Sequence, residues 1–157
     1  QGNVTTLQGR YVGEPREDVQ KFTFAWGQGP RWPYRCDRLA RADAGVVVAV
    51  TEGAIDAESF NVLARRQRAN AVAVALPSVS SVEAWAPSWF RLFAGRRCAS
   101  ALDNDAAGKK HTADLVARLA ASAVPGGVSV LVPKGAKDWN AVLCAALVAA
   151  PARKVAA

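Results

Sequence analysis

The chain alternates between strand-like apolar runs and segments with helical spacing, and this alternation restricts its fold more than any other feature. The clearest run, Val46–Thr51, is a continuous apolar and β-branched stretch of the kind buried on both faces of a parallel sheet. It is far too short to cross a bilayer. Further runs lie at Ala71–Leu76, Arg96–Leu102 and Val128–Val132. Four β–α alternations predict the α/β class, with a Rossmann-like parallel sheet of about four strands, right-handed crossovers and helices on both faces.

Helices are expected between and after these runs, because apolar side chains recur there at helical spacing. The expected helices are Ala54–Gln67, a helix from Ser80 or Ser81 to about Phe93, Ala106–Ser122 and Asp138–Ala150. Pro151 is a stop signal for the last helix. In such a sheet, ligands bind beyond the carboxyl ends of the strands, so candidate site residues are sought there.

The N-terminal part of the chain differs from the rest. Val4–Leu7, Gly9–Val12 and Lys21–Trp26 have the character of short strands separated by turn residues, and several arginines follow them. The expected organisation is a small antiparallel β subdomain with a basic linker over residues 1–45, the main domain over residues 46–150, and a tail over residues 151–157.

Composition and charge narrow the function classes. The 157 residues suit one domain of ordinary size, and a composition that is 51% apolar and 21% charged excludes a disordered or collagen-like chain. There are 20 Lys and Arg against 13 Asp and Glu, a net charge of +7. Because basic residues are clustered, this excess favours a polyanionic partner, nucleic acid before an acidic membrane, and we expect no membrane partner. Basic charge that only aids solubility is the alternative.

The three cysteines lie far apart, and none belongs to a CxxC or Cys/His pattern. Unpaired thiols indicate a reducing compartment, so we expect a cytoplasmic protein. No signal or transit segment is visible. The chain begins with Gln1 and contains no methionine, and we expect it to be a piece of a longer protein.

Acidic residues follow three of the four runs, where each strand should end. Glu52 follows the first run, and Asp56 falls in the first turn of the next helix, where it also suits the helix dipole. Asp103 and Asp105 follow the third run, and their spacing of two lets both point to one side of an extended turn. Asp105 could instead cap the following helix. Asp138, after the fourth run, suits both a cap and a site role.

Parallel topology should bring these five carboxylates to one crevice, where they would repel each other strongly. A carboxylate cluster without nearby fixed cations is best explained by bound metal, and ligands that are all oxygen select Mg²⁺ or Mn²⁺. A basic protein with an acidic metal crevice suits phosphoryl chemistry on nucleic acid. Its basic surface would hold the backbone while metals act on one phosphate.

Three motifs, each following a strand-like run, together resemble the TOPRIM domain. They are Glu52-Gly53-x-x-Asp56, Asp103-x-Asp105-x-x-Gly108 and Lys137-Asp138-x-Asn140. The TOPRIM fold is shared by bacterial-type primases, type IA and type II topoisomerases and several nucleases. The Asp-Asn-Asp-Ala-Ala-Gly and Lys-Asp-Trp-Asn forms are most similar to primases and primase–helicases of phages, plasmids and other mobile elements. The resemblance covers residues 46–145 well and residues 5–40 loosely.

The resemblance implies roles for each of the five acids. Glu52, Asp103 and Asp105 would be catalytic and would hold Mg²⁺ or Mn²⁺, two ions in all. Asp56 and Asp138 would be outer or second-metal acids.

Basic residues would bind the nucleic acid or the nucleotide in the same reaction. Arg10 and Lys21 are similar to residues that touch template or incoming nucleotide. Lys109 and Lys110 could steer phosphates to the metals, or could form a solvated helix face. Topoisomerases usually carry a third acid two positions beyond the Asp pair, and Ala107 stands there in this chain, which favours the primase pattern.

Other polar and aromatic residues are expected to be structural. His111 is expected to be a surface or satisfied polar residue rather than a metal ligand. Arg96 and Arg97 open the third run, at the edge opposite the site, and are expected to face solvent. Trp32 and Tyr34 could stack on bases, although packing between the two parts of the chain is favoured.

The function that the resemblance implies is nucleotidyl transfer by the catalytic domain of a DNA primase, which makes short primers on single-stranded DNA. Its partners would be that template, nucleoside triphosphates and a replicative helicase or helicase domain. A TOPRIM-type nuclease cutting DNA or RNA, and a non-catalytic nucleic-acid-binding module, are the alternatives. A haloacid-dehalogenase-like phosphatase suits the chain less well, because its nucleophilic Asp should follow the first strand, whereas the Asp pair here follows the third.

Overall fold

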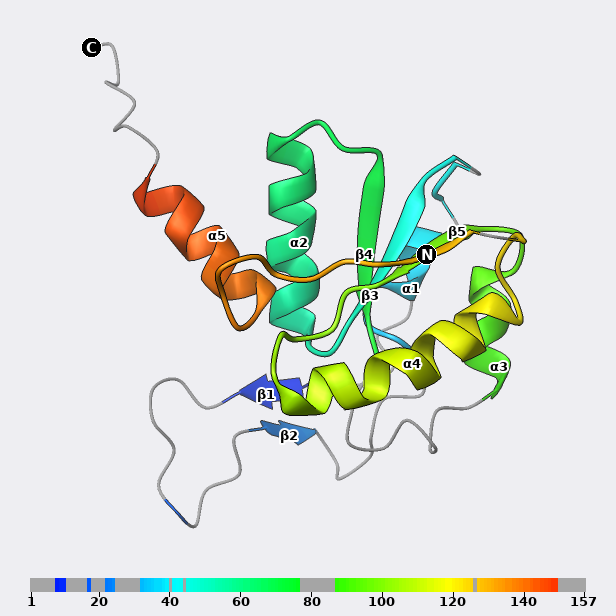
Figure 1. Ribbon diagram of the computed structural model, residues 1–157, viewed down its shortest axis with the longest axis horizontal. Helices are drawn as coiled ribbons and strands as arrows, with labels where there is room; N and C mark the ends of the chain where they lie inside the picture. Colours follow the sequence, from blue (N-terminus) through cyan, green and yellow to red (C-terminus); the bar gives the residue numbers. More distant parts are fainter. Residues whose placement is uncertain are drawn as a thin grey trace.

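Figure 1 shows the computed structural model of the chain, which describes residues 8–10, 17, 22–24, 32–39, 41–43, 45–76, 87–125 and 127–149. In chain order its elements are β1 (Gln8–Arg10), β2 (Phe22–Phe24), α1 (Cys36–Leu39), β3 (Val47–Thr51), α2 (Ala54–Arg66), β4 (Ala71–Ala75), α3 (Pro87–Phe90), the 3₁₀ helix η3 (Arg91–Phe93), β5 (Arg97–Ser100), α4 (Ala106–Ala120), β6 (Val128–Val130) and α5 (Trp139–Val148).

Strands β3 to β6 form one parallel sheet in the order β4-β3-β5-β6. The central strand β3 pairs with β4 on one side, from Val47 opposite Ala71 to Thr51 opposite Ala75, and with β5 on the other. The α/β class and the parallel sheet of four strands flanked by helices are therefore confirmed. Each strand forms where an apolar run predicts one, because a strand buried on both faces needs apolar side chains at every position.

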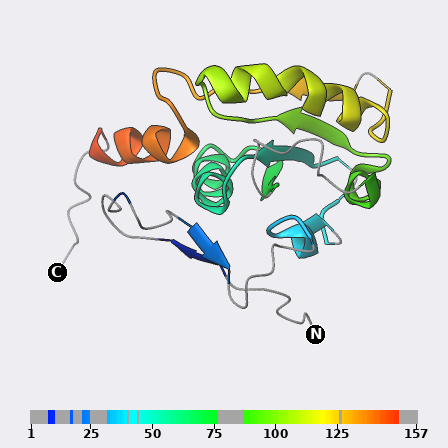
Figure 2. The ribbon, with the colours of Figure 1, turned by 90° about the horizontal axis from the view of Figure 1, so that it is seen from below.

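The two faces of the sheet are packed by side chains of different size. On one face, Val48 and Val74 pack against α3, η3 and α4 in a core that includes Leu115. On the other face, Ala49 and Ala73 pack beneath α2, with α5 beyond it. Figures 1 and 2 show α2 and α5 on one side of the strands and α4 on the other. Because alanine is small, α2 can pack closely on this face of the sheet.

A short helix, α1, lies in the segment expected to be a basic linker, and its Leu39 is part of the core. The expectation that Arg96 faces solvent is wrong. Its guanidinium donates hydrogen bonds to the carbonyl oxygens of Leu39 at 2.7 Å and Ala42 at 3.2 Å. Leu39 is the last residue of α1 and Ala42 lies in the turn after it, so this contact ties the segment around α1 to the start of β5. Arg97 is exposed, as expected.

Two sequence predictions fall partly outside the described residues. The helix predicted from Ser80 or Ser81 is present at its end as α3 and η3, and its predicted start lies outside the described residues. The predicted strand Val4–Leu7 also lies outside them. β1 and β2 form an antiparallel pair in the N-terminal part, with Gln8 opposite Phe24. Within the described part of the chain, no helix is long and apolar enough to cross a membrane.

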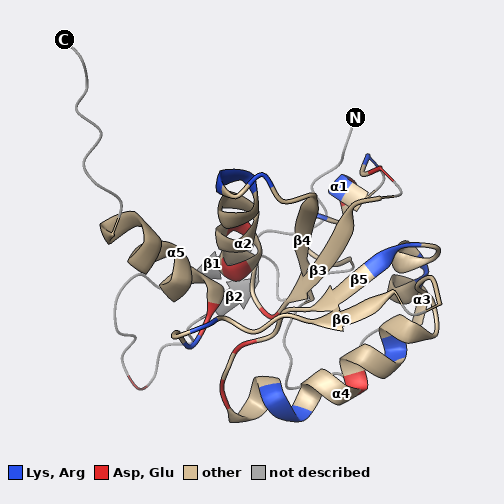
Figure 3. Cartoon of the chain, turned by 45° about the horizontal axis from the view of Figure 1, so that its top comes forward, with Lys and Arg blue, Asp and Glu red and all other residues tan. Residues whose placement is uncertain are grey.

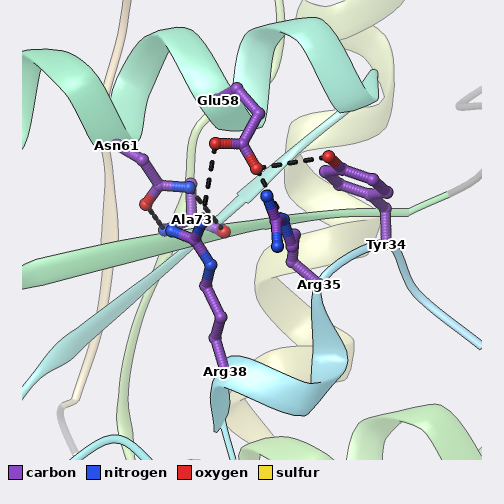
Figure 4. A network of polar contacts seen from close by, with 6 residues as sticks. All are labelled: Tyr34, Arg35, Arg38, Glu58, Asn61 and Ala73. Carbon is purple, nitrogen blue, oxygen red and sulfur yellow. Dashed lines mark hydrogen bonds and ion pairs between the residues drawn. The ribbon is translucent and has the colours of Figure 1, made fainter. Parts of the chain in front are cut away.

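The polar groups on the outer side of the edge strand β4 are covered by two other segments. The Asn61 side chain, on α2, accepts a hydrogen bond from the Ala73 N–H at 2.8 Å and donates one to the Ala73 carbonyl at 3.2 Å (Figure 4). Two residues further on, the backbone of Tyr34 exchanges two hydrogen bonds with Ala75. An unpaired strand edge is a template for pairing with another chain, so these contacts close the sheet on this side.

Glu58 joins the segment around α1 to α2. Its carboxylate accepts a hydrogen bond from the Tyr34 hydroxyl at 3.2 Å and from Arg35 Nε at 2.7 Å, and it lies 3.7 Å from an Arg38 nitrogen (Figure 4). These groups are partly exposed, so each ion pair contributes little to stability. Their main effect is to fix the position of this segment against the helix that follows Glu52.

We predict that the Asn61→Leu variant lowers the free energy of unfolding by about 2–4 kcal/mol, because two backbone groups of Ala73 lose their partner in a buried environment. Asn70→Ala is the matched control. Asn70 is exposed and makes one hydrogen bond, to Gly45, so we expect a change of about 0.5 kcal/mol or less. Urea unfolding of both variants measures the difference, and equal losses would contradict the prediction.

Candidate metal-binding site

The candidate site lies where the order of the strands reverses. From β3 the chain passes through α2 to β4 on one side, and from β5 it passes through α4 to β6 on the other. The loops after β3 and β5 therefore leave in opposite directions and open a crevice between the carboxyl ends of two neighbouring strands. This is the position at which parallel sheets bind their ligands. Glu52 follows β3 directly, and Asp103 lies in the loop after β5.

Glu52 and Asp103 are in contact in this crevice. The Asp103 N–H donates a hydrogen bond to Glu52 Oε1 at 3.3 Å. The first turn of α4 packs against both residues through Gly108, which is buried. A Cβ at position 108 would collide with the Asp103 carbonyl and lie 3.0 Å from Glu52 Oε1. Only glycine lets the helix approach this closely.

Two other predicted acids are helix caps. Asp105 is the N-cap of α4, and its Oδ1 accepts a hydrogen bond from the Gly108 N–H at 3.0 Å. Asp138 is the N-cap of α5 and accepts from the Ala141 N–H at 2.7 Å. The cap interpretation that the sequence offered for both residues is thus confirmed, and it leaves one oxygen of each carboxylate outside the cap.

Asp56 and Lys137 complete the surroundings of the crevice. Asp56, in the first turn of α2 as predicted, accepts a hydrogen bond from the Asn140 N–H at 3.2 Å, which ties α2 to α5. Lys137 Nζ lies 3.4 Å from Asp105 Oδ2. The Asn104 N–H donates to the Lys137 carbonyl at 2.7 Å, so the loops after β5 and β6 are joined through the backbone. Figure 3 shows the acidic stretches grouped at this end of the sheet.

Burial and mutual repulsion change the acidity of the carboxylates. Burial raises the pKa of Asp103 to about 7, with further contributions from the nearby Glu52, Asp56, Asp138 and Asp105. The pKa of Glu52 is raised in the same way, chiefly by burial, although the Asp103 N–H opposes this. The Gly108 N–H, aided by Lys137, lowers the pKa of Asp105. The crevice therefore holds two carboxylates that lack charge compensation, Glu52 and Asp103, beside one that is well compensated.

The residues of the crevice fit a divalent cation. Asp103 Oδ1 is buried and has no hydrogen-bond partner among the described residues, a costly state for a carboxylate oxygen that a cation would relieve. All the candidate ligands are oxygens, which suits Mg²⁺ or Mn²⁺. Among the described residues, no three Asp, Glu, His or Cys side chains already form a metal-binding group. Asp56, Asp105 and Asp138 each accept a hydrogen bond from a backbone N–H.

The sequence matches the Toprim-like family over residues 49–143, which is more than half of the chain. The chain belongs to this family. No curated protein and no solved structure matches it significantly. Toprim domains bind divalent metal ions, typically Mg²⁺, and occur in enzymes such as primases and nucleases, so membership indicates metal-dependent processing of nucleic acid. The crevice between β3 and β5 of this Toprim domain lies within the matched residues.

The structure describes the side chains of only some of the predicted basic residues. Lys109 and Lys110 are exposed at the start of α4, next to the crevice. Arg10 lies in β1, but its side chain is not described, and Lys21 lies outside the described residues. Sequence reasoning did not select Lys137 as a site residue, although it stands in the same motif as Asp138. Its pairing with Asp105 depends on the contact between two loops that are far apart in sequence.

We predict that the metal-free protein becomes less stable as the pH rises from about 4 to about 7. A pKa raised above its value in the unfolded chain means that the folded state binds the Asp103 proton more tightly, so ionisation favours unfolding. The Asp103→Asn variant should lose most of this dependence. Urea unfolding in a chelator at about pH 5 and pH 8 measures it. Asp114→Asn, at an exposed position on α4, is the control and should behave as the wild type; equal behaviour of the two variants would refute the prediction.

Proposed function

We propose that this Toprim domain carries out metal-dependent nucleotidyl transfer on nucleic acid, as the catalytic domain of a DNA primase. The observation that supports this most strongly is the contact between Glu52 and Asp103 at the strand-order reversal, with a buried Asp103 oxygen that has no partner. This pair would hold one ion together with Asp105. Asp56 and Asp138 would act as outer acids or as ligands of a second ion.

Different residues of the chain would have different roles in the reaction. Bound Mg²⁺ or Mn²⁺ would supply Lewis-acid stabilisation of the phosphate that is attacked. With a pKa of about 7, Asp103 is about half protonated at neutral pH, so an entering cation would compete with a proton for it. Lys109 and Lys110, exposed beside the crevice, would attract the phosphates of the substrate. The hydrogen bond from the backbone N–H of Asp103 would orient the Glu52 carboxylate before a cation arrives.

The proposed partners are a single-stranded DNA template and nucleoside triphosphates, with a replicative helicase suggested by the resemblance to primase–helicases. The net charge of +7 supports a polyanionic partner. Ala107, which stands where topoisomerases carry a third acid, supports the primase form.

A nuclease is the second candidate, and one observation favours it. With a pKa of about 7 and a buried, unpartnered oxygen, Asp103 could accept a proton from an attacking water. The same property would serve a 3′-hydroxyl nucleophile in primer synthesis. The two functions therefore differ in the nucleophile and not in the acids, and an assay must detect both products.

We predict that short oligonucleotides form on a circular single-stranded DNA template with nucleoside triphosphates and Mg²⁺ or Mn²⁺. Glu52→Gln and Asp103→Asn should reduce product by at least about 100-fold, because each removes a charge that the reaction centre needs. Asp114→Asn, which changes the same charge on an exposed turn of α4, should retain activity. Denaturing gels of the products make the measurement.

The pattern of products decides between the candidates. Template cleavage that disappears in the two site variants, without new oligonucleotides, would refute primer synthesis and support the nuclease. Activity that persists in both site variants would refute the proposed site. DNA binding without any product would favour a non-catalytic binding module.

A further inference from the structure

Both oxygens of the Asp105 carboxylate already have partners. Oδ1 accepts the capping hydrogen bond from the Gly108 N–H at 3.0 Å, and Oδ2 faces Lys137 Nζ at 3.4 Å. The cap satisfies a backbone group at the start of α4 that the helix itself cannot satisfy. The oxygen outside the cap is Oδ2, which Lys137 faces, so a cation that binds there would meet the lysine.

The backbone of Lys137 is held by a hydrogen bond, whereas its side chain is largely exposed. Its carbonyl accepts a hydrogen bond from the Asn104 N–H, which anchors it to the loop that carries Asp103 and Asp105. Its side chain is 65% exposed, and its one ion pair with a described residue is the pair with Asp105. A lysine side chain has four flexible carbons and three donors. The ammonium can therefore leave Asp105 and reach another anion nearby without movement of the backbone.

Two cations that share one carboxylate oxygen repel each other, which weakens the binding of both. A divalent ion on Asp105 Oδ2 would stand within a few ångströms of the Lys137 ammonium, and like charges at such separations repel. The ion would carry twice the charge and would also attract Glu52 and Asp103, so it would outcompete the lysine for Asp105. The displaced ammonium would then be available to a phosphate bound by the ion.

We propose that Lys137 is the resident counter-ion of Asp105, which gives up its place to the divalent ion and then binds a phosphate oxygen of the nucleotide. This inference rests on the proposed metal-dependent function and adds a phosphate-binding residue to it. It assigns Lys137 two opposite effects: it weakens the binding of free metal and strengthens the binding of a metal–nucleotide complex.

The test compares Lys137→Gln with Lys134→Gln. Lys134 lies on the same loop, is exposed, and makes no ion pair with a described residue. Free Mn²⁺ is titrated by electron paramagnetic resonance, and the preformed Mn²⁺–ATP complex by calorimetry. We expect Lys137→Gln to bind free Mn²⁺ about two- to fivefold more tightly than wild type and Mn²⁺–ATP about tenfold more weakly. Lys134→Gln should change both affinities much less, and Lys137→Arg should restore the wild-type order.

The possible results separate this inference from the function on which it rests. If wild type binds no Mn²⁺, and Asp103→Asn behaves the same, the proposed metal-dependent function fails and the role of Lys137 fails with it. If wild type binds Mn²⁺ but the two glutamine variants behave alike, only the role of Lys137 is refuted. Changes of the same sign for free Mn²⁺ and Mn²⁺–ATP would also refute it, because a general loss of positive charge or of structure has no reason to reverse sign.

Discussion

Repulsion among carboxylates at one end of the sheet is the constraint that governs this part of the molecule. The chain compensates for it mainly with backbone N–H groups, which Asp56, Asp105 and Asp138 each use. The first turns of α2, α4 and α5 all lie at this end, and helix N-termini favour negative charge. Asp103 is the residue that this compensation does not reach, since it is half-buried, has an oxygen without a partner, and has a pKa of about 7.

Small residues, rather than the acids, set the dimensions of the crevice. The alanine layer beneath α2 allows this helix to pack closely on the sheet, beside the turn that the pairing of β3 with β5 brings near the end of β5. Gly108 does the same for α4, because any side chain there would meet Asp103 and Glu52. At Gly53, a Cβ would lie only 3.2 Å from a carboxylate oxygen of Asp56. The glycines of the sequence motifs thus have a packing reason that is separate from the chemistry of the acids.

The sequence was sufficient for the parallel sheet and for the neighbourhood of the acids, but not for their individual partners. Apolar runs such as Val46–Thr51 must be buried on both faces, and the reversal of strand order then fixes which loops meet. The hydrogen-bond and ion-pair partners of a side chain depend on the direction in which it points. Hydrophobic periodicity carries no information about that direction for a polar residue. Arg96 follows a loop at the far end of the sheet and looks solvent-facing in sequence, yet its guanidinium donates hydrogen bonds to the carbonyls of Leu39 and Ala42. The Lys137–Asp105 pair was likewise not predictable, because it joins two loops across the crevice.

The capping role of Asp105 and Asp138 does not compete with a role in metal binding. A carboxylate has two oxygens and about four acceptor positions, and the cap occupies only one of these. The cap also holds the carboxylate in one orientation, so that Oδ2 of Asp105 points away from the helix toward Lys137. Asn and Ser cap helices about as well as Asp, so capping alone does not require a charge at either position. The negative charges of Asp105 and Asp138 lie close to Asp103 and increase the repulsion among these carboxylates. Helix capping alone gives no reason for this energetic cost. Binding of a cation would give a reason for these charges, because the carboxylates that destabilise the metal-free crevice would then attract the ion.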